Sequence, residues 1–205
     1  MPSAPSRSGS GDSTKSAGGS TRDRELSVNL YSPENGHWAA YMRAKGANDG
    51  TIYHVRSDVQ KDQDRFYYDE KPQVFQSPSL YGSSVVGRLS SGEAARVEAS
   101  IRSYASDDRN IPRVSHGTNC QNFVGGALGR LEQDGLVKTG QSQYFSQQYG
   151  QRGEDIGKDL QRTGRHFALV QRAKPQGAPA ARFGEQETRR PLGRLNMSAY
   201  SHLSE

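Results

Sequence analysis

The only cysteine of the chain stands at the head of an apolar helical pattern, in the stretch Asn119–Val124. The polar residues 115–118 form a turn before it, and Gly135 marks a helix stop after it. Apolar side chains recur between them at helical spacing: Phe123, Val124, Ala127, Leu128 and Leu131. The pattern predicts a helix with Cys120 in its first turn and an inward apolar face. Because unpaired N–H groups and the positive dipole end stabilise a thiolate there, we expect the pKa of Cys120 to be lowered.

Upstream of this helix, alternating apolar residues predict a set of paired strands that carry two histidines. Strands are expected at residues 26–30, 37–42 and 51–55, joined by turns at 32–36 and 46–50. His37 starts the second of these strands and His54 lies on the third, with 16 residues between them. Since the second and third strands should pair as a hairpin, the two imidazoles can converge.

The rest of the chain adds two helices and further strands. Ser90 and Glu93 have capping-box spacing and predict a helix that runs to about Tyr104. We also expect strands at 65–68 and 85–89, an irregular loop at 71–84, a turn at 107–112, a helix at 154–162, and a strand or helix end at 167–170. Together these elements predict an α+β fold, in which the helix of Cys120 packs on an antiparallel sheet of about four to six strands.

Composition divides the chain into a folded middle and two polar ends. Hydrophobic residues make up 32% of the 205 residues, and the mean hydropathy is −0.90. Residues 1–24 are rich in Ser, Gly and Pro, while Pro, Gly and Arg dominate from Lys174 onward. Such segments bury too little apolar surface to offset the entropy of ordering. We therefore predict a disordered arm at 1–24, a folded domain at 25–173 and a disordered basic tail at 174–205.

Charge and cysteine content limit the classes of function. The net charge of +5 is spread along the chain, which is a weak electrostatic footprint for nucleic acid. No apolar run approaches the roughly 20 residues of a transmembrane helix, and the N-terminus lacks a signal-peptide pattern. A lone cysteine excludes an intrachain disulfide scaffold. We expect a soluble cytoplasmic protein that does not bind nucleic acid.

Cysteine, base and orienting group together make a thiol catalyst. A single buried cysteine or strand histidine is more often structural, but Cys120, His37 and His54 form a combination with this chemistry. His116, four residues before the cysteine, is the rival candidate for the base; its structural interpretation is a solvated turn residue. Zinc binding is disfavoured because no close Cys/His pair has ligand spacing. No metal or organic cofactor is expected.

Three segments resemble one known group of proteins. His37–Tyr41 (His-Trp-Ala-Ala-Tyr), Tyr53–Val55 (Tyr-His-Val) and Asn119–Val124 (Asn-Cys-Gln-Asn-Phe-Val) are similar to the motifs of the lecithin-retinol-acyltransferase-like (LRAT-like) group. That group belongs to the NlpC-type papain-like superfamily and includes the H-Ras-like suppressor phospholipases/acyltransferases. The resemblance implies a circularly permuted papain-like fold, with the histidines before the cysteine.

The resemblance also implies a role for each matched residue. Cys120 would be the nucleophile, His37 the base and His54 the orienting third member. The backbone N–H of Cys120 would stabilise the oxyanion, with Asn119 supporting the site. Gln121 and Asn122 stand where the group has Glu-His.

The resulting functional hypothesis is a cysteine hydrolase or acyltransferase. Its substrate would carry an acyl group, lipid or peptide-like, as an ester, thioester or amide, and the intermediate would be an acyl-enzyme at Cys120. The alternative is a catalytically silent binding protein that keeps the same fold. Within the helix, the missing side chains of Gly125 and Gly126 would let another backbone pack close. Three aromatic residues further on would fill core or line a substrate groove: Tyr144, Phe145 and Tyr149.

Overall fold

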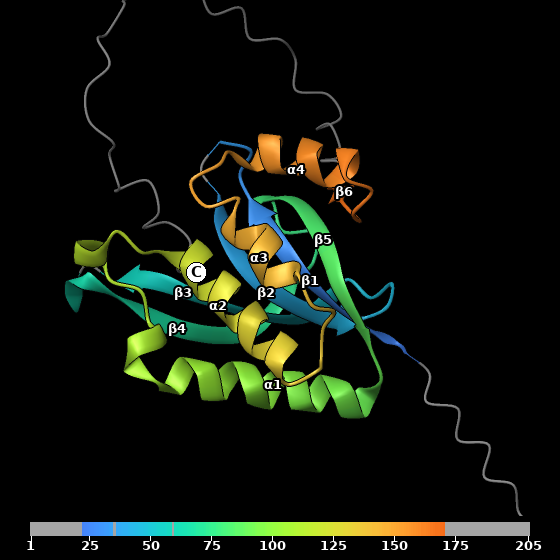
Figure 1. Ribbon diagram of the computed structural model, residues 1–205, viewed down its shortest axis with the longest axis horizontal. Coiled ribbons are helices and arrows are strands. Elements are labelled where there is room, and N and C mark those ends of the chain that lie inside the picture. Colours follow the sequence, from blue (N-terminus) through green and yellow to red (C-terminus); the bar gives the residue numbers. More distant parts are fainter. Residues whose placement is uncertain (1–21, 35, 59, 171–205) are drawn as a thin grey trace, which may run out of the picture. The chain divides into compact units, whose positions relative to one another are not determined.

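The computed structural model describes residues 22–34, 36–58 and 60–170, which form a sheet covered by helices (Figure 1). Six strands make one antiparallel sheet in the order β4-β3-β2-β1-β5-β6. They are β1 (Arg24–Tyr31), β2 (His37–Ala44), β3 (Asp49–Asp58), β4 (Asp62–Val74), β5 (Leu80–Leu89) and β6 (Ala168–Leu169). The predicted α+β class with an antiparallel sheet is confirmed. The predicted tail at 174–205, and all but the last three residues of the predicted arm at 1–24, lie outside the described residues.

Four α-helices and two 3-10 helices occur in the described part of the chain. They are α1 (Ser91–Ser106), η1 (Asp108–Asn110), η2 (Val114–His116), α2 (Cys120–Gln133), α3 (Gln141–Ser146) and α4 (Gly153–Arg162). The predicted capping box of α1 is present: Ser90 Oγ accepts from the Glu93 N–H, and the Glu93 carboxylate accepts from the Ser90 N–H. None of these described helices combines the length and apolar character needed to cross a bilayer.

The predicted irregular loop at 71–84 is wrong at both ends. Residues 71–74 continue β4, residues 80–84 begin β5, and only 75–79 connect them. Lys71 and Pro72 pair with Ile52 and Thr51 of β3. A proline is tolerated here because β4 is an edge strand, so a backbone N–H is dispensable on its free side. Composition suggested a loop, whereas pairing with a long β3 overrides that local preference.

The core lies between the sheet and α2, which crosses in front of β2 and β3 with α1 on one side and α3 on the other (Figure 1). Trp38 of β2 and Phe123 of α2 are almost completely buried in it. The sequence predicted that another backbone would pack close at Gly125 and Gly126, but the atoms nearest to both glycines belong to side chains. A methyl group at Gly125 would collide with the Tyr149 hydroxyl, and one at Gly126 with that of Tyr104. These glycines therefore set how near α2 lies to its neighbours.

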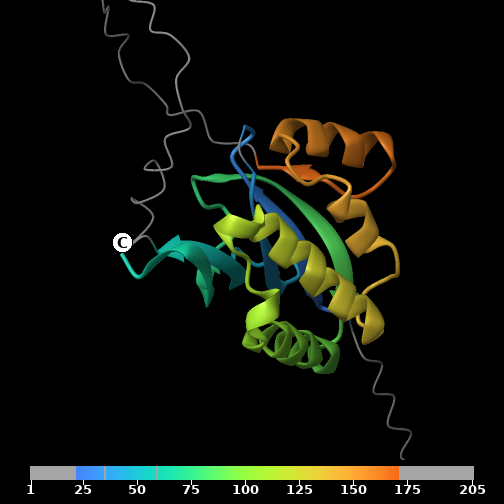
Figure 2. The same ribbon diagram turned by 60° about the vertical axis from the view of Figure 1, so that its left-hand side comes forward.

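Strands β2 and β3 pair over a short length only, and this split positions the site. Four residue pairs join them, ending at Ala40 and Tyr53, against eight pairs between β1 and β2 and ten between β3 and β4. Figure 2 shows part of the β3–β4 ribbon standing away from β1, β2 and β5. The first residues of β2, from His37, thus have no β3 partner in the ladder. The N-terminus of α2 approaches β2 at this place.

Candidate functional site

Cys120 is the first residue of α2, as the sequence predicts, and a capping box of two reciprocal hydrogen bonds closes the N-terminus of the helix. The Asn119 side chain accepts a hydrogen bond from the Gln121 N–H at 2.9 Å. In return, Asn122 Oδ1 accepts from the Asn119 N–H at 2.9 Å. This reciprocal pair satisfies donors that the first turn would otherwise leave unpaired. The amide of Asn119 is therefore committed to holding the first turn, and with it the start of the thiol-bearing helix.

The thiol lies against the backbone of β2 and is largely shielded from water. Cys120 Sγ is 4.0 Å from the carbonyl oxygen of Gly36, and the residue is 9% exposed. Burial raises the pKa of Cys120 to about 11, while hydrogen bonds from the backbone N–H groups of Trp38, Gln121 and Cys120 itself act in the opposite direction. The predicted lowering of the thiol pKa is therefore not found, because desolvation outweighs the donors at the helix start.

The two histidines do converge, and they form a hydrogen-bonded chain across three strands. His37 Nε2 of β2 lies 3.0 Å from His54 Nδ1 of β3, with the ring centroids 5.2 Å apart. His54 Nε2 lies 3.3 Å from Asp69 Oδ2 of β4. Burial, with a smaller contribution from the neighbouring His54, lowers the pKa of His37 to about 3. Burial also lowers the pKa of His54, although its hydrogen bond to Asp69 works against this. At neutral pH both rings are therefore uncharged.

The thiol lies against the main chain of the segment that carries His37. The groups around the sulfur, the Gly36 carbonyl and the Trp38 N–H, belong to the residues on either side of His37. Within the described residues, no hydrogen bond joins the sulfur to the imidazole. His37 Nε2 is engaged by His54, and Nδ1, the ring nitrogen nearer the main chain, makes no hydrogen bond within the described residues. This arrangement places the thiol and the two imidazole rings near the same end of β2.

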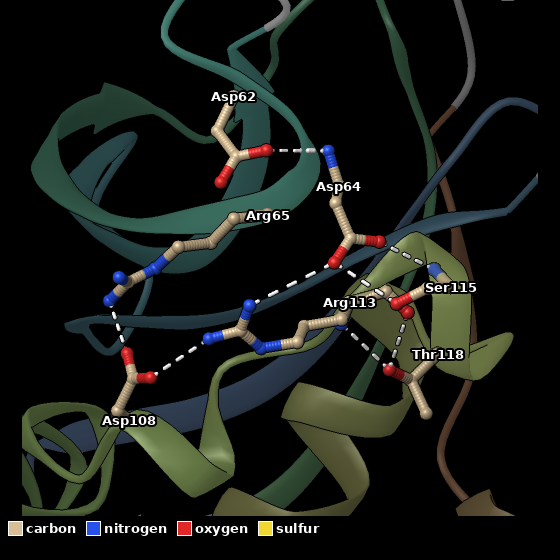
Figure 3. Close-up of polar contacts among 7 residues, drawn as sticks. All are labelled: Asp62, Asp64, Arg65, Asp108, Arg113, Ser115 and Thr118. Atoms are coloured by element: carbon tan, nitrogen blue, oxygen red, sulfur yellow. Dashed lines mark hydrogen bonds and ion pairs between the residues drawn. The ribbon is translucent and has the colours of Figure 1, made fainter.

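Ion pairs and hydrogen bonds tie the loop that leads into Cys120 to strand β4 (Figure 3). Asp64 accepts from the Ser115 N–H at 2.6 Å and from its hydroxyl at 3.0 Å. Arg113 pairs with Asp64 at 3.8 Å and with Asp108 at 3.0 Å, and Arg65 pairs with Asp108 from the strand side. These contacts lie on the surface and hold the segment just before Cys120.

His116, the rival candidate for the base, is exposed in η2. Its backbone N–H donates to the Arg113 carbonyl at 3.1 Å, and its ring makes no hydrogen bond within the described residues. The structure thus brings His37 and His54 together, while the His116 ring takes no part in their hydrogen-bonded chain.

Sequence reasoning missed two residues of this site, Asp69 and Gln121. Gln121 is 5% exposed; its Nε2 donates to the Gly36 carbonyl at 3.1 Å, and its Oε1 accepts from the Gly150 N–H at 2.8 Å. It joins the start of α2 to the turn before β2 and to the segment before α4. Asp69 pairs in register with His54. Only the β3–β4 register could have indicated that Asp69 lies opposite His54. That register depends on the full length of the β3–β4 hairpin, which the sequence pattern does not reveal.

The aromatic residues after α2 belong to the core. Phe145 is fully buried and Tyr144 is 9% exposed, while the Trp38 ring packs on Phe145 and Tyr149, with centroids 5.6 and 6.0 Å away. Of the two roles open to these residues, core packing describes the contacts observed. In residues 22–170, apart from 35 and 59, no three Cys, His, Asp or Glu side chains are grouped as metal ligands would be.

Fold and site define an α+β protein whose sheet carries a His-His-Asp chain and whose helix α2 begins with a cysteine that lies against the Gly36 backbone. The chain belongs to a family of unknown function, DUF6540, whose family model matches residues 26–138, a little more than half of the sequence. The matched range contains His37, His54, Asp69 and Cys120. Comparison with curated proteins and with solved structures gives no match.

Proposed function

We propose that this protein is a cysteine-dependent hydrolase or acyltransferase, with Cys120 as nucleophile, His37 as base and His54 as the residue that orients the base. The observation that carries the proposal is the 3.0 Å hydrogen bond between the two imidazoles, one of which belongs to the residue that follows Gly36, whose carbonyl oxygen faces the sulfur of the sole cysteine. A nucleophile, a base and a group that orients the base are the general requirement for covalent acyl transfer. The permuted papain-like arrangement of the LRAT-like group is part of this proposal.

The resting state sets how the proton must move. The thiol of Cys120 is protonated and the His37 ring is neutral at pH 7, so no preformed thiolate–imidazolium pair is present. His37 Nδ1 takes the thiol proton as sulfur attacks the acyl carbonyl, and the backbone N–H of Cys120 donates to the oxyanion. The imidazolium then protonates the leaving group, which departs and leaves a thioester. Water or another acceptor, deprotonated in turn by His37, releases the acyl group.

The substrate class follows from this chemistry. A thiol nucleophile with a histidine base suits an ester, thioester or amide, and the acyl group is of lipid or peptide type. The competing function is a silent binding protein on the same fold. The observation that favours it is the burial of the thiol and its raised pKa.

Intact-protein mass spectrometry with p-nitrophenyl butyrate separates these two functions. We expect a burst of p-nitrophenol of about one equivalent per chain, a butyryl adduct mapped to Cys120, and slower steady turnover. Cys120→Ser should lose the burst, and Cys120→Ala should lose both burst and adduct. Iodoacetamide labelling of the native and the denatured protein serves as control. A thiol that reacts only after denaturation, in a protein that forms no adduct, would establish the binding protein instead.

A further inference from the structure

The histidine chain ends on a carboxylate, and this end determines where every proton in the chain lies. Asp69 Oδ2 is 3.3 Å from His54 Nε2, and a carboxylate oxygen accepts a hydrogen bond. His54 Nε2 must therefore carry a hydrogen. In a neutral imidazole the other nitrogen then has the lone pair, so His54 Nδ1 is an acceptor.

The same reasoning passes on to the second ring. His37 Nε2 is 3.0 Å from His54 Nδ1, and since Nδ1 is an acceptor, His37 Nε2 must be the donor. A neutral His37 with its hydrogen on Nε2 has its lone pair on Nδ1, the nitrogen on the main-chain side of the ring. The Cys120 sulfur lies against that main chain, beside Gly36 and Trp38.

We infer that Asp69 is a positioning residue that sets the tautomers of His54 and His37 and so makes His37 Nδ1 the base. The inference rests on the proposed function for its kinetic consequence, while its structural content, the tautomers, stands apart from any activity. Asp69 touches neither thiol nor substrate and acts only through the two rings.

The other groups around Asp69 do not replace it in this role. Arg56 Nε and Lys71 Nζ approach the same carboxylate oxygen at 3.5 and 3.7 Å, from neighbouring positions on β3 and β4. Both are cations that donate only, so neither can accept the hydrogen of His54 Nε2. Their ion pairs with Asp69 hold the carboxylate in place. The acceptor function belongs to Asp69 alone among the residues that contact the His54 ring through hydrogen bonds.

The test is the tautomeric state of His37 and His54 by two-bond ¹H–¹⁵N correlation spectroscopy at pH 7.5, on the full chain with ¹⁵N-labelled histidine. The chain has five histidines, so the His37→Gln and His54→Gln variants assign the two signals. We expect both rings to be protonated on Nε2 in the wild type. Asp69→Asn should mix the tautomers of both rings, because an amide can present either a donor or an acceptor. Lys71→Gln removes a cation that approaches the same carboxylate and leaves the acceptor in place, so the tautomers of both rings should be unchanged.

Kinetics supply a second measurement that a merely structural role would not reproduce. Asp69→Asn should slow p-nitrophenyl butyrate turnover at least about tenfold, and less than the about 10⁴-fold that a wrong tautomer of the base itself costs. In a His54→Gln background, the glutamine carbonyl accepts from His37 Nε2 without help, so Asp69→Asn should then add less than about twofold.

Three results would overturn the inference. They are a wild-type His37 protonated on Nδ1, unchanged tautomers in Asp69→Asn, and an equal loss of rate from Asp69→Asn in both backgrounds. The wild-type spectrum tests the inference even if the Asp69→Asn variant does not fold, because it shows which nitrogen of His37 carries the hydrogen. If both rings are protonated on Nε2 but the protein shows no turnover, the proposed function is refuted and the role of Asp69 stands. If the protein turns over substrate but His37 is protonated on Nδ1, the role of Asp69 is refuted and the proposed function stands.

Discussion

The two halves of the candidate site are held by different kinds of interaction. The histidine half lies on β2, β3 and β4, where His37 and His54 are hydrogen-bonded within a sheet. The cysteine half is the start of α2 and the loop before it, and that loop is attached by surface groups, among them Asp64 and Arg113. Exposed ion pairs contribute little each, whereas buried polar groups must keep their partners.

Because of this difference, substitutions in the two halves should have different effects: on the rate of turnover in the histidine half, and on the position of the thiol in the cysteine half. Substitution in the histidine half changes the ionisation and tautomers of the proposed base, His37, so its main effect should be on the rate of turnover. In the cysteine half, the packing of α2 decides where the thiol stands, and the surface network adds only a small correction. Burial also acts in opposite directions, since it lowers the pKa values of His37 and His54 and raises that of Cys120. The protein should therefore lose stability in acid through one half and in alkali through the other.

The largest expected effect is in the histidine half. His37→Ala removes the group that moves the proton and should reduce p-nitrophenyl butyrate turnover by about 10²–10⁴-fold. His54→Gln keeps an acceptor for His37 Nε2 and should be milder, while His54→Leu should fall further. His116→Ala, in the exposed η2, is the matched control and should be nearly silent. Circular dichroism checks the fold of each variant. Loss of activity in His116→Ala with retention in His37→Ala would show that the base had been misassigned.

The next effect concerns the packing that places the thiol. Gly126→Ala adds a methyl group where the Tyr104 hydroxyl lies, and overpacking of this kind should cost about 1–3 kcal/mol in the free energy of unfolding. Denaturant titration measures it. Tyr104→Phe in the same chain removes the colliding oxygen and should recover part of the loss. A Gly126→Ala variant as stable as the wild type would show that α2 can shift. It would contradict the view that close packing of α2, more than the surface contacts of the preceding loop, fixes the position of the thiol.

The pH dependence of stability tests the two halves against each other. Between about pH 6.5 and 5, the unfolded chain binds a proton at His37 that the folded chain, with its pKa near 3, does not. Stability should therefore fall as the pH decreases, by about 1 kcal/mol per pH unit, before the carboxylates titrate. His37→Gln should flatten this slope.

At alkaline pH the dependence of stability on pH has the opposite sign, because of the Cys120 thiol. The folded pKa of Cys120 is about 11 against 9.0 in the unfolded chain, so stability should fall as the pH rises above 9. Cys120→Ser should remove this loss, most clearly between pH 9 and 10, below the ordinary tyrosine range. Thermal melts across pH 5 to 10 measure both arms. An alkaline arm unchanged by Cys120→Ser would mean that the thiol is not desolvated.

The smallest expected effect is on the surface network. Asp64→Asn removes the charge that faces Arg113 and weakens the acceptor for Ser115, and it should lower the melting temperature only slightly. The difference from wild type should shrink further in about 1 M NaCl, because salt screens exposed charges. Asp62→Asn, whose carboxylate accepts the Asp64 N–H at 2.8 Å, is the control within the same turn. A loss of turnover comparable to that of His37→Ala would show that this loop, and not the packing of α2, places the nucleophile.

Local patterns in the sequence determined much of this fold. Alternation and turn residues placed His37 and His54 on neighbouring strands, and the apolar stripe after Cys120 predicted a helix that begins at that residue. These predictions hold because strand period, turn chemistry and helix capping depend on residues within a few positions of one another.

Tertiary structure alone decided the partners and the electrostatics of the site. Asp69 reaches His54 only through the register of the β3–β4 hairpin, and Gln121 bridges segments 85 and 29 residues away, at Gly36 and Gly150. The helix start favours a thiolate at Cys120, yet the packing of α2 against β2 removes water from the sulfur, and desolvation prevails. Register and burial arise from contacts between distant segments, so no local pattern contains them.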